Sequence, residues 1–345
     1  MTDKAADGRK LCKDAGNDIF KRNKRVRPVT GVQRILRIVS QYKEAVLRDD
    51  AVFLVYDNNV GAAGGNALNQ KLAVMLKHNN VSGLEFLEMA IAEDDAAALE
   101  CGLHGCIPER VIETVEKYRP ELMGLKARID DKFCFDPVYV MEQMRALGDQ
   151  LEMPIAIHAP RSRIGIEKLL QYMKAGDVLC HTLAGNSEVM NIIDKDGHIK
   201  PCVLEARDRG VIFDLSHGTN AYSYDTAEAA WKAGFFTDTV SSDLHGRNTN
   251  GPVYNMGVVL SKVRGLTGKP WWWILNKAVA EPVRLQGIPD KAVEVREGMQ
   301  ADLTVFRIDE GSFNYLDSKK ENREFSEKAT AVYTCLGSKV YLCRT

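Results

Sequence analysis

The sequence has almost no net charge and no long apolar run. Its 345 residues carry 46 Lys and Arg against 47 Asp and Glu, a formal charge of -1, so no overall field attracts nucleic acid or an anionic membrane. No apolar run reaches the roughly 18 residues that span a bilayer. The first residues, MTDKAADGRK, contain no apolar segment typical of a secretion signal. We therefore expect a cytoplasmic protein with neither a nucleic-acid nor a membrane partner.

Paired cysteines and the common nucleotide or nucleophile motifs are also absent. The eight cysteines are scattered along a long chain, which favours reduced thiols over a disulfide framework. The sequence contains no Gly-rich phosphate loop, no Ser-centred nucleophile elbow and no internal repeat. Hydrophobic residues make up 45% and charged residues 27%, proportions that are typical of a folded globular protein.

The composition divides the chain into three parts. Residues 1–50 are basic, with thirteen Lys and Arg against seven acidic residues, and predict an atypical N-terminal segment. Residues 51–285 alternate short apolar runs with helical periodicity, and we interpret them as one large domain. Residues 286–345 contain two β-type runs around a polar stretch at 318–328, which predicts a small β-sandwich-like appendage.

The large domain shows the alternation of buried parallel strands and crossover helices. This number of strand–helix units favours an α/β fold of the (β/α)8 TIM-barrel type, although periodicity alone also allows an open sheet. The predicted strands are 51–56, 81–86, 122–128, 153–158, 177–181, 211–215 and 237–243. The predicted helices include 108–118, 137–150, 165–175, 226–233 and 254–263.

Ionisable side chains stand at the carboxyl ends of successive predicted strands. These residues are Lys126, His158, His181, His217 and Asp243. In a barrel the carboxyl ends of all strands converge on one mouth, so we expect these side chains to lie together. Each alone also has a structural explanation, because a histidine there is commonly a hydrogen-bonded core residue and an aspartate commonly a helix cap. A lysine in an apolar strand is harder to explain, since burying an unpartnered ammonium is costly.

This set of residue types predicts a hydrolytic metal site. Two histidines and a carboxylate suit zinc, which activates a bound water when one coordination position stays open. A lysine carboxylated by CO2 is itself a carboxylate that bridges two metal ions, and the reaction removes the buried positive charge. These residue types suit a site for one or two zinc ions, which Lys126 fits if it is carboxylated.

Several motifs resemble those of the amidohydrolase superfamily. Its dihydroorotase-like amidohydrolase/deacetylase branch is the most similar, and the likeness extends from about residue 51 to the C-terminus. The motifs are GLKAR at 124–128, PIAIHAP at 154–160, DVLCHTLAGN at 177–186, GVIFDLSHG at 210–218, TVSSDLHG at 239–246 and REGMQADLTVF at 296–306.

The resemblance implies roles for the matched residues. Lys126 is implied to be the carboxylated bridging ligand, and His158 and His181 are implied to bind the more exposed metal. Asp243 is implied to bind the other metal and to act as the general base. Flanking residues extend the implied site: His217 and Arg128 are predicted to contact the substrate, and His245 is predicted to bind substrate or orient Asp243.

One family feature has no counterpart in this sequence. The superfamily's first barrel strand ends in His-x-His, which supplies two ligands of the buried metal, yet only His78 and His104 precede Lys126, and they stand far apart. We interpret residues 1–50 as truncated, replaced or altered relative to the family, which predicts a barrel that is incomplete at the N-terminus. The consequence is either a single-metal site or a loss of activity.

Three functions follow. The first is a metal-dependent hydrolase that cleaves an amide or ester bond of a small carboxylated molecule, with deacetylation leading. The second is a catalytically impaired homologue that acts as a scaffold, and the third is a cyclic-amide hydrolase like dihydroorotase. We expect a small-molecule substrate as partner. The Trp271–Trp273 run is consistent with core filling or with a homo-oligomer contact.

Overall fold

The computed structural model describes residues 52–53, 85–88, 108–118, 122–132, 134, 136–244, 248–285, 302–336 and 339–343. These residues form two compact units. The small unit contains residues 52–53, 302–309, 329–336 and 339–343, and the large unit contains the remaining described residues.

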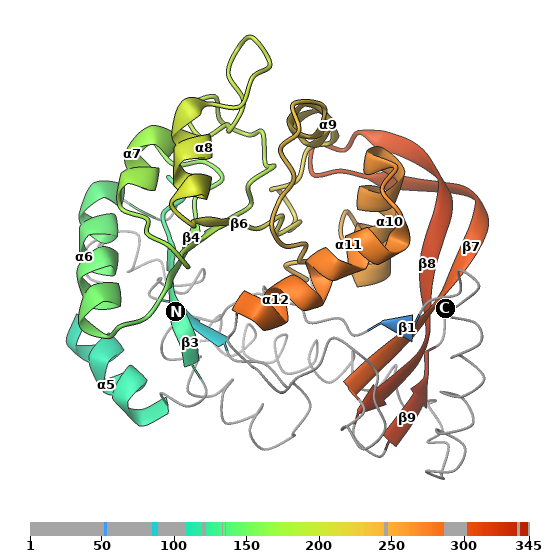
Figure 1. Cartoon of the computed structure of the whole chain (residues 1–345), viewed down its shortest axis with the longest axis horizontal. Coiled ribbons are helices and arrows are strands. Elements are labelled where there is room, and N and C mark those ends of the chain that lie inside the picture. The colour runs from blue at the N-terminus through green and yellow to red at the C-terminus, as the bar shows by residue number, and fades with distance from the viewer. Residues whose placement is uncertain are drawn as a thin grey trace, which may run out of the picture. The chain divides into compact units, whose positions relative to one another are not determined.

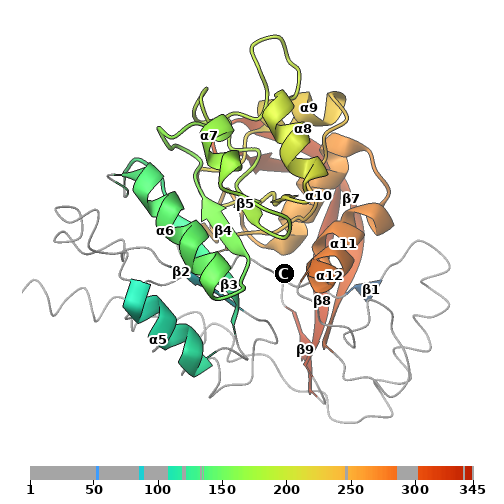
Figure 2. The ribbon, with the colours of Figure 1, turned by 60° about the vertical axis from the view of Figure 1, so that its left-hand side comes forward.

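The large unit is built on a parallel sheet. Its strands are β2 (Glu85–Glu88), β3 (Leu122–Arg128), β4 (Ile155–His158), β5 (Val178–Cys180) and β6 (Ile212–Phe213), paired in that order. The helices between them are α5 (Pro108–Tyr118), α6 (Pro137–Gln150), α7 (Ile166–Gln171) and α8 (Pro201–Asp208). These helices follow one another along one side of the strands (Figures 1 and 2). Within the described residues the sheet has five strands and does not close into a ring.

Local sequence explains the strand and helix bounds of this unit. Strand β3 is buried from Gly124 to Ala127, as expected for a strand that is covered on both faces. Helix α6 begins after Asp136, whose carboxylate accepts hydrogen bonds from the Val138 and Tyr139 amides, and Pro137 occupies the first turn. These caps fix the start of the helix, and its buried side packs on β3 and β4.

The sheet continues beyond β6 through an irregular segment. Asp214 and Thr239 form a parallel β-bridge, and further backbone bonds join the two chain segments that follow it, up to Gly218 and Ser242. The predicted strand 237–243 is therefore reduced to one bridge and its flanking hydrogen bonds. Its Ser-rich sequence, TVSSD, supplies side-chain hydroxyls that bond locally, in competition with a regular ladder.

Four helices complete the large unit. They are α9 (Tyr224–Lys232), α10 (Met256–Thr267), α11 (Trp271–Ala278) and α12 (Ala280–Leu285). Helix α10 starts at the cap Asn255 and ends at Gly268 in the left-handed conformation, the usual termination by glycine. Trp272 on α11 is exposed. None of the helices in the described part of the chain has the length and apolarity needed to cross a membrane.

The small unit is a mixed-length sheet with the strand order β1-β7-β8-β9. Its strands are β1 (Val52–Phe53), β7 (Asp302–Leu316), β8 (Asn322–Leu336) and β9 (Lys339–Leu342). The C-terminal part of β7 and the N-terminal part of β8 belong to the large unit. Leu303, Cys335 and Val340 form its small core.

Two further predictions about strands were wrong. We predicted residues 51–56 as a parallel strand of the large domain, but β1 pairs antiparallel with β7; an apolar run indicates a strand without indicating its partner. We interpreted residues 318–328 as a polar stretch between strands, but β8 already begins at Asn322. Phe325 is buried there between the exposed residues Glu324 and Ser326. This alternation is typical of a strand with one solvent-exposed face.

Candidate functional site

The carboxyl ends of β3, β4 and β5 bring several predicted site residues side by side. In the parallel register Arg128 lies opposite His158, and His158 lies opposite Cys180, the residue before His181. Lys126 precedes Arg128 by two positions in the same strand, so both side chains leave one face of β3. The structure thus places Lys126, Arg128, His158 and His181 at one edge of the sheet.

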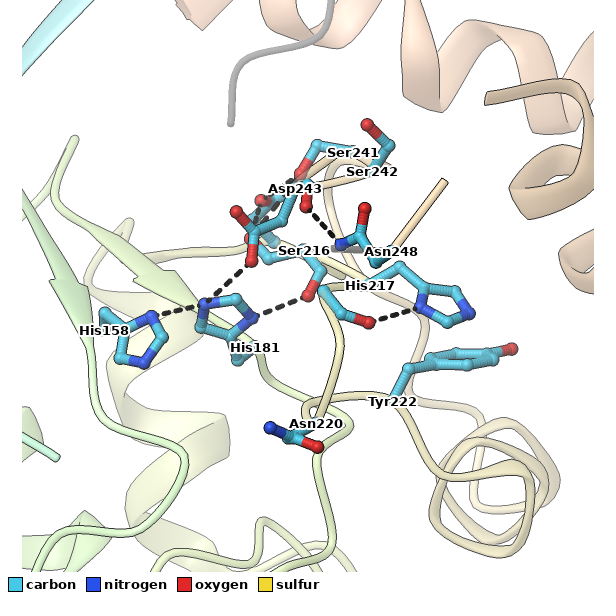
Figure 3. A network of polar contacts seen from close by, with 12 residues as sticks. His158, His181, Ser216, His217, Asn220, Tyr222, Ser241, Ser242, Asp243 and Asn248 are labelled. Atoms are coloured by element: carbon cyan, nitrogen blue, oxygen red, sulfur yellow. Dashed lines mark hydrogen bonds and ion pairs between the residues drawn. The ribbon is translucent and has the colours of Figure 1, made fainter. Parts of the chain in front are cut away.

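The centre of the site is a pair of histidines facing a carboxylate (Figure 3). The distance from His181 Nε2 to His158 Nδ1 is 2.6 Å, and the distance from the same His181 nitrogen to Asp243 Oδ2 is 3.9 Å. The His181 side chain is completely buried, whereas Asp243 retains 16% exposure. Of these three groups, Asp243 and one edge of His158 are accessible to solvent or a ligand.

Hydrogen bonding fixes the tautomer of His181. Its Nδ1 lies 2.6 Å from the carbonyl oxygen of Ser216, and a carbonyl only accepts, so Nδ1 carries the proton. The Nε2 atom therefore presents a lone pair, and the His158 Nδ1–H donates to it. A metal-binding histidine is commonly oriented in this way, with its other ring nitrogen bonded to a backbone carbonyl.

Both imidazoles are held in the neutral form that binds metals. Burial, and then the positive charge of Lys126, lowers the pKa of His181 to about 3. Burial also holds the pKa of His158 well below its usual value, with smaller effects from His181, Arg128 and Lys126. Lys126 itself is 7% exposed, so its charge is scarcely hydrated.

Unusual backbone conformations accompany these side chains. His181, Ser216 and Asp243 adopt positive φ angles of 61°, 42° and 47°. A non-glycine residue in this region is conformationally strained, and such strain is concentrated at functional sites, where surrounding structure enforces it. The Asn248 side chain contributes to this enforcement, because its amide donates to the Asp243 carbonyl oxygen over 2.9 Å.

His217 lies apart from the histidine pair and has other contacts. Its ring faces Tyr222, with 4.6 Å between the ring centroids (Figure 3). The Nδ1–H donates to the Gly218 carbonyl over 2.9 Å, and Nε2 accepts from the Lys262 Nζ over 2.9 Å. Both ring nitrogens therefore have protein partners, so a substrate contact by His217 requires one of them to be released.

Other predictions have different outcomes. Arg128 is half-buried on the strand face next to His158, where a substrate contact remains a prediction. His245, His78 and His104 lie outside the described residues. The sequence analysis missed Asp214 and Lys262, which are both buried beside the site. A lysine on the apolar stripe of the helix that contains Val258, Val259 and Val263 was the available signal for Lys262.

The donor chemistry fits zinc, although the present spacing is that of a hydrogen bond. Among the described residues, no group of three or more His, Cys, Asp and Glu side chains is arranged to hold a metal ion. Two nitrogens bound to one tetrahedral zinc lie about 3.3 Å apart, whereas His158 and His181 are separated by 2.6 Å. A displacement of about 0.7 Å between the two nitrogens, with the His158 proton moved from Nδ1 to Nε2, would allow both to bind one ion.

A small hollow lies next to His181, between the loops that follow β4 and β5. Its volume is about 290 Å³, including the solvent at its mouth. The small residues Ala159, Ala184 and Gly185 form part of the wall, and Thr182 and Asn186 contribute polar groups. The enclosed part of the hollow is large enough for about one water molecule.

Curated proteins with similar sequences are deacetylases. No protein-family model matches the chain. A deacetylase from Enterococcus faecalis is 27% identical over 257 residues, which cover 73% of this chain and 67% of that protein. Deacetylases from Agrobacterium fabrum and Brucella anthropi are 23% and 22% identical over 234 residues, which cover 67% of this chain. The chain spans only 56% of the length of these two relatives.

Solved structures with the same fold agree with the predicted fold class. An adenine deaminase gives a TM-score of 0.74 at 24% identity and covers 82% of this chain and 77% of its own. A dihydroorotase gives a TM-score of 0.71 at 18% identity and covers 86% of this chain and 80% of its own. At these identities the likeness shows the fold alone. Together the comparisons confirm the predicted TIM-barrel class and the resemblance inferred from the motifs.

Proposed function

From the resemblance to the deacetylase branch of the amidohydrolase superfamily, we propose that this chain is a zinc-dependent hydrolase. Its substrate is a small carboxylated molecule, from which water removes an acyl group at an amide or ester bond. The observation that carries the proposal is the convergence of Lys126, His158, His181 and Asp243 at the carboxyl edge of one parallel sheet. The deacetylase relatives favour acyl removal over ring opening of a cyclic amide.

The histidine pair supplies the neutral ligands of the proposed site. A zinc ion bound there would lower the pKa of its water and polarise the scissile carbonyl. His181 already presents an Nε2 lone pair because its Nδ1–H is engaged by the Ser216 carbonyl. Its low pKa keeps this lone pair unprotonated near pH 7, so no proton has to leave before the residue binds an ion.

Asp243 and Lys126 have complementary roles in the proposal. Asp243 is partly exposed with an oxygen 3.9 Å from His181 Nε2, which allows it to take a proton from the attacking water and deliver it to the leaving group. Carboxylation converts the Lys126 amine into an anionic ligand. This conversion removes a positive charge from a side chain that is 7% exposed, where an ammonium is costly.

Arg128 is the proposed contact for the carboxylate of the substrate. It leaves the same strand face as Lys126 and lies opposite His158 in the register. A guanidinium in this place forms bidentate hydrogen bonds with a carboxylate. The substrate would then lie between Arg128 and the histidine pair, with its acyl carbon nearest Asp243.

Metal content and product assays test the proposal. The protein is expressed with added zinc, and its bound metal is measured together with acetate release from N-acyl and O-acyl acids; a dihydroorotate ring-opening assay runs beside it. One or two zinc ions per chain with acetate release support the proposal. Ring opening alone supports the dihydroorotase alternative, and a metal-free inactive protein supports the scaffold alternative.

Two variants test the assigned roles. Asp243→Asn should lower kcat by about 10²–10⁴-fold, the usual contribution of a general base. Lys126→Ala should lower both zinc content and turnover, whereas Lys168→Ala, a change at an exposed lysine, should alter neither. Wild-type turnover in either site variant contradicts the assignment.

A further inference from the structure

Asp214 is a buried carboxylate that three hydroxyl groups surround. It follows β6 and is 3% exposed. Thr239 Oγ1 donates to its Oδ1 and Ser241 Oγ donates to its Oδ2, each over 2.6 Å. Ser216 Oγ also donates to Oδ2. Hydrogen bonds to an ionised acceptor are stronger than neutral ones, so this carboxylate holds all three residues firmly.

Two of the three hydroxyls belong to residues that control the proposed site. The Ser216 carbonyl accepts the Nδ1–H of His181 over 2.6 Å, so the place of Ser216 decides the tautomer of that ring. Ser241 lies two positions before Asp243 and fixes the segment that carries the proposed base. The third hydroxyl, on Thr239, is farther from Asp243 along the same segment, four positions before it.

Backbone pairing makes the two segments a single rigid unit. The Leu215 amide donates to the Thr239 carbonyl, and the His217 amide donates to the Ser241 carbonyl, each over 3.1 Å. The segments also contain Ser216 and Asp243 with positive φ angles. Such conformations persist only when neighbouring structure enforces them, and the Asp214 carboxylate is the group that ties both segments together at their base.

We propose that Asp214 is a positioning residue for the hydrolytic site. Through Ser216 it keeps the proton of His181 on Nδ1, and through Ser241 it holds the segment that presents the Asp243 carboxylate. The inference rests on the proposed function, in which His181 binds the metal and Asp243 transfers the proton. It extends that function by naming the group that aligns both residues.

The decisive variant is Asp214→Asn, which preserves side-chain volume and leaves a single acceptor oxygen for the three hydroxyls. Thr239→Val is the matched control, because it removes one hydrogen bond to the same carboxylate and leaves the hydroxyl groups of Ser216 and Ser241 in place. Circular dichroism and thermal unfolding show that each variant is folded.

The direct measurement is the tautomer of His181. In ¹⁵N-histidine-labelled protein the protonated and unprotonated ring nitrogens have well-separated shifts, and a His181→Gln spectrum assigns the signals. In wild type and Thr239→Val we expect the Nδ1–H form. In Asp214→Asn we expect a mixture, because the Ser216 carbonyl is released and His158, with its own proton moved to Nε2, can accept at Nδ1 a proton from His181 Nε2.

Zinc affinity gives a second measurement, by competition with a chelator. Loss of an outer partner of a ligand typically weakens metal binding by about 10–100-fold, so we expect this loss in Asp214→Asn and wild-type affinity in Thr239→Val. Unchanged His181 shifts and unchanged zinc affinity in Asp214→Asn overturn the inference. A wild-type protein without zinc overturns the proposed function instead, and the tautomer spectrum still decides the role of Asp214.

A less severe pair of variants covers the case in which Asp214→Asn does not fold. Ser216→Ala and Ser241→Ala each remove one hydroxyl and leave the carboxylate in place. Ser216→Ala should alter the His181 shifts, and Ser241→Ala should lower kcat with little change in KM while the His181 shifts stay as in wild type. If both variants behave as wild type, the positioning role is wrong.

Discussion

The amine of Lys262 lies 2.9 Å from His217 Nε2 in the buried interior of the large unit. It also donates to the carbonyl oxygens of Pro252 and Leu316, over 2.5 and 2.7 Å. Three acceptors thus surround the Lys262 amine. Lys262 thereby joins helix α10, the segment after β6 and the end of β7, all of which belong to the large unit.

Lys262 makes the stability of the fold depend on pH. Burial lowers its pKa from 10.5 to about 7, against a smaller opposite effect of Asp317. Between these two pH values the unfolded chain binds the proton and the folded chain does not, so the free energy of unfolding rises with pH. The slope from this residue approaches about 1.4 kcal/mol per pH unit, and it vanishes below pH 7.

Urea unfolding between pH 6 and 9 measures this effect. Lys262→Met should remove the rise above pH 7 that wild type shows, so the deficit of the variant should grow with pH. Lys168→Met, at an exposed position, should keep the wild-type slope. Parallel pH profiles of wild type and Lys262→Met contradict the low pKa of Lys262.

Zinc should raise the melting temperature through the histidine pair. An ion that binds only the folded state adds about 2.7 kcal/mol of stability when its concentration is a hundred times its Kd. His158→Ala should abolish most of this increase, because it removes one of the two facing nitrogens. His198→Ala is the matched control, since that imidazole is 79% exposed. An equal zinc-induced shift in His158→Ala would place the ion elsewhere.

Local sequence predicts much of the fold. The helices at 108–118 and 137–150 have the predicted bounds, because each begins with a proline that suits the first helical turn. The edge that carries Lys126, His158 and His181 is likewise predictable, since parallel strands end at one side of a sheet. Residues 51–56 were assigned to the wrong sheet because strand pairing depends on residues far along the chain.

The contacts made by the groups that support the site could not be predicted from local sequence. Lys262 reaches His217 from 45 positions away, and Thr239 reaches Asp214 from 25 positions away. Neither pair has a sequence signature, because their proximity arises only after helices and strands pack. The partners of His217 were not predictable in this way either, because its ring is bonded to Gly218 and Lys262; the substrate contact predicted for it stays a prediction.

Tyr224 should stabilise the large unit by one buried hydrogen bond. Its hydroxyl donates to the Tyr315 carbonyl over 2.9 Å, and no part of the residue is exposed. Tyr224→Phe keeps the ring but leaves that carbonyl without this donor, so the free energy of unfolding should fall by about 1–3 kcal/mol. Urea unfolding measures the loss. A change below about 0.5 kcal/mol would mean that water replaces the hydroxyl as donor.

Gly218 should be required for the position of the proposed base. Its φ is +54°, and a Cβ added there would lie 2.7 Å from Asp243 Oδ2 and 3.4 Å from His181 Cε1. Gly218→Ala therefore displaces the Asp243 carboxylate. We expect a fall in kcat of about tenfold or more, because small misplacements of catalytic groups cost up to about 10²-fold.

Gly268→Ala separates this effect from the cost of the backbone. Gly268 has a φ of +63°, but a Cβ there meets nothing within 4 Å. In each variant the left-handed conformation costs the alanine about 1–2 kcal/mol. The free energy of unfolding should therefore fall by a similar amount in both variants from this cause. Only Gly218→Ala should also lose turnover, since only its methyl group meets Asp243. Equal hydrolysis rates in the two variants would show that the Asp243 carboxylate is not confined by the segment after β6, and its role as a precisely placed base would then be untenable.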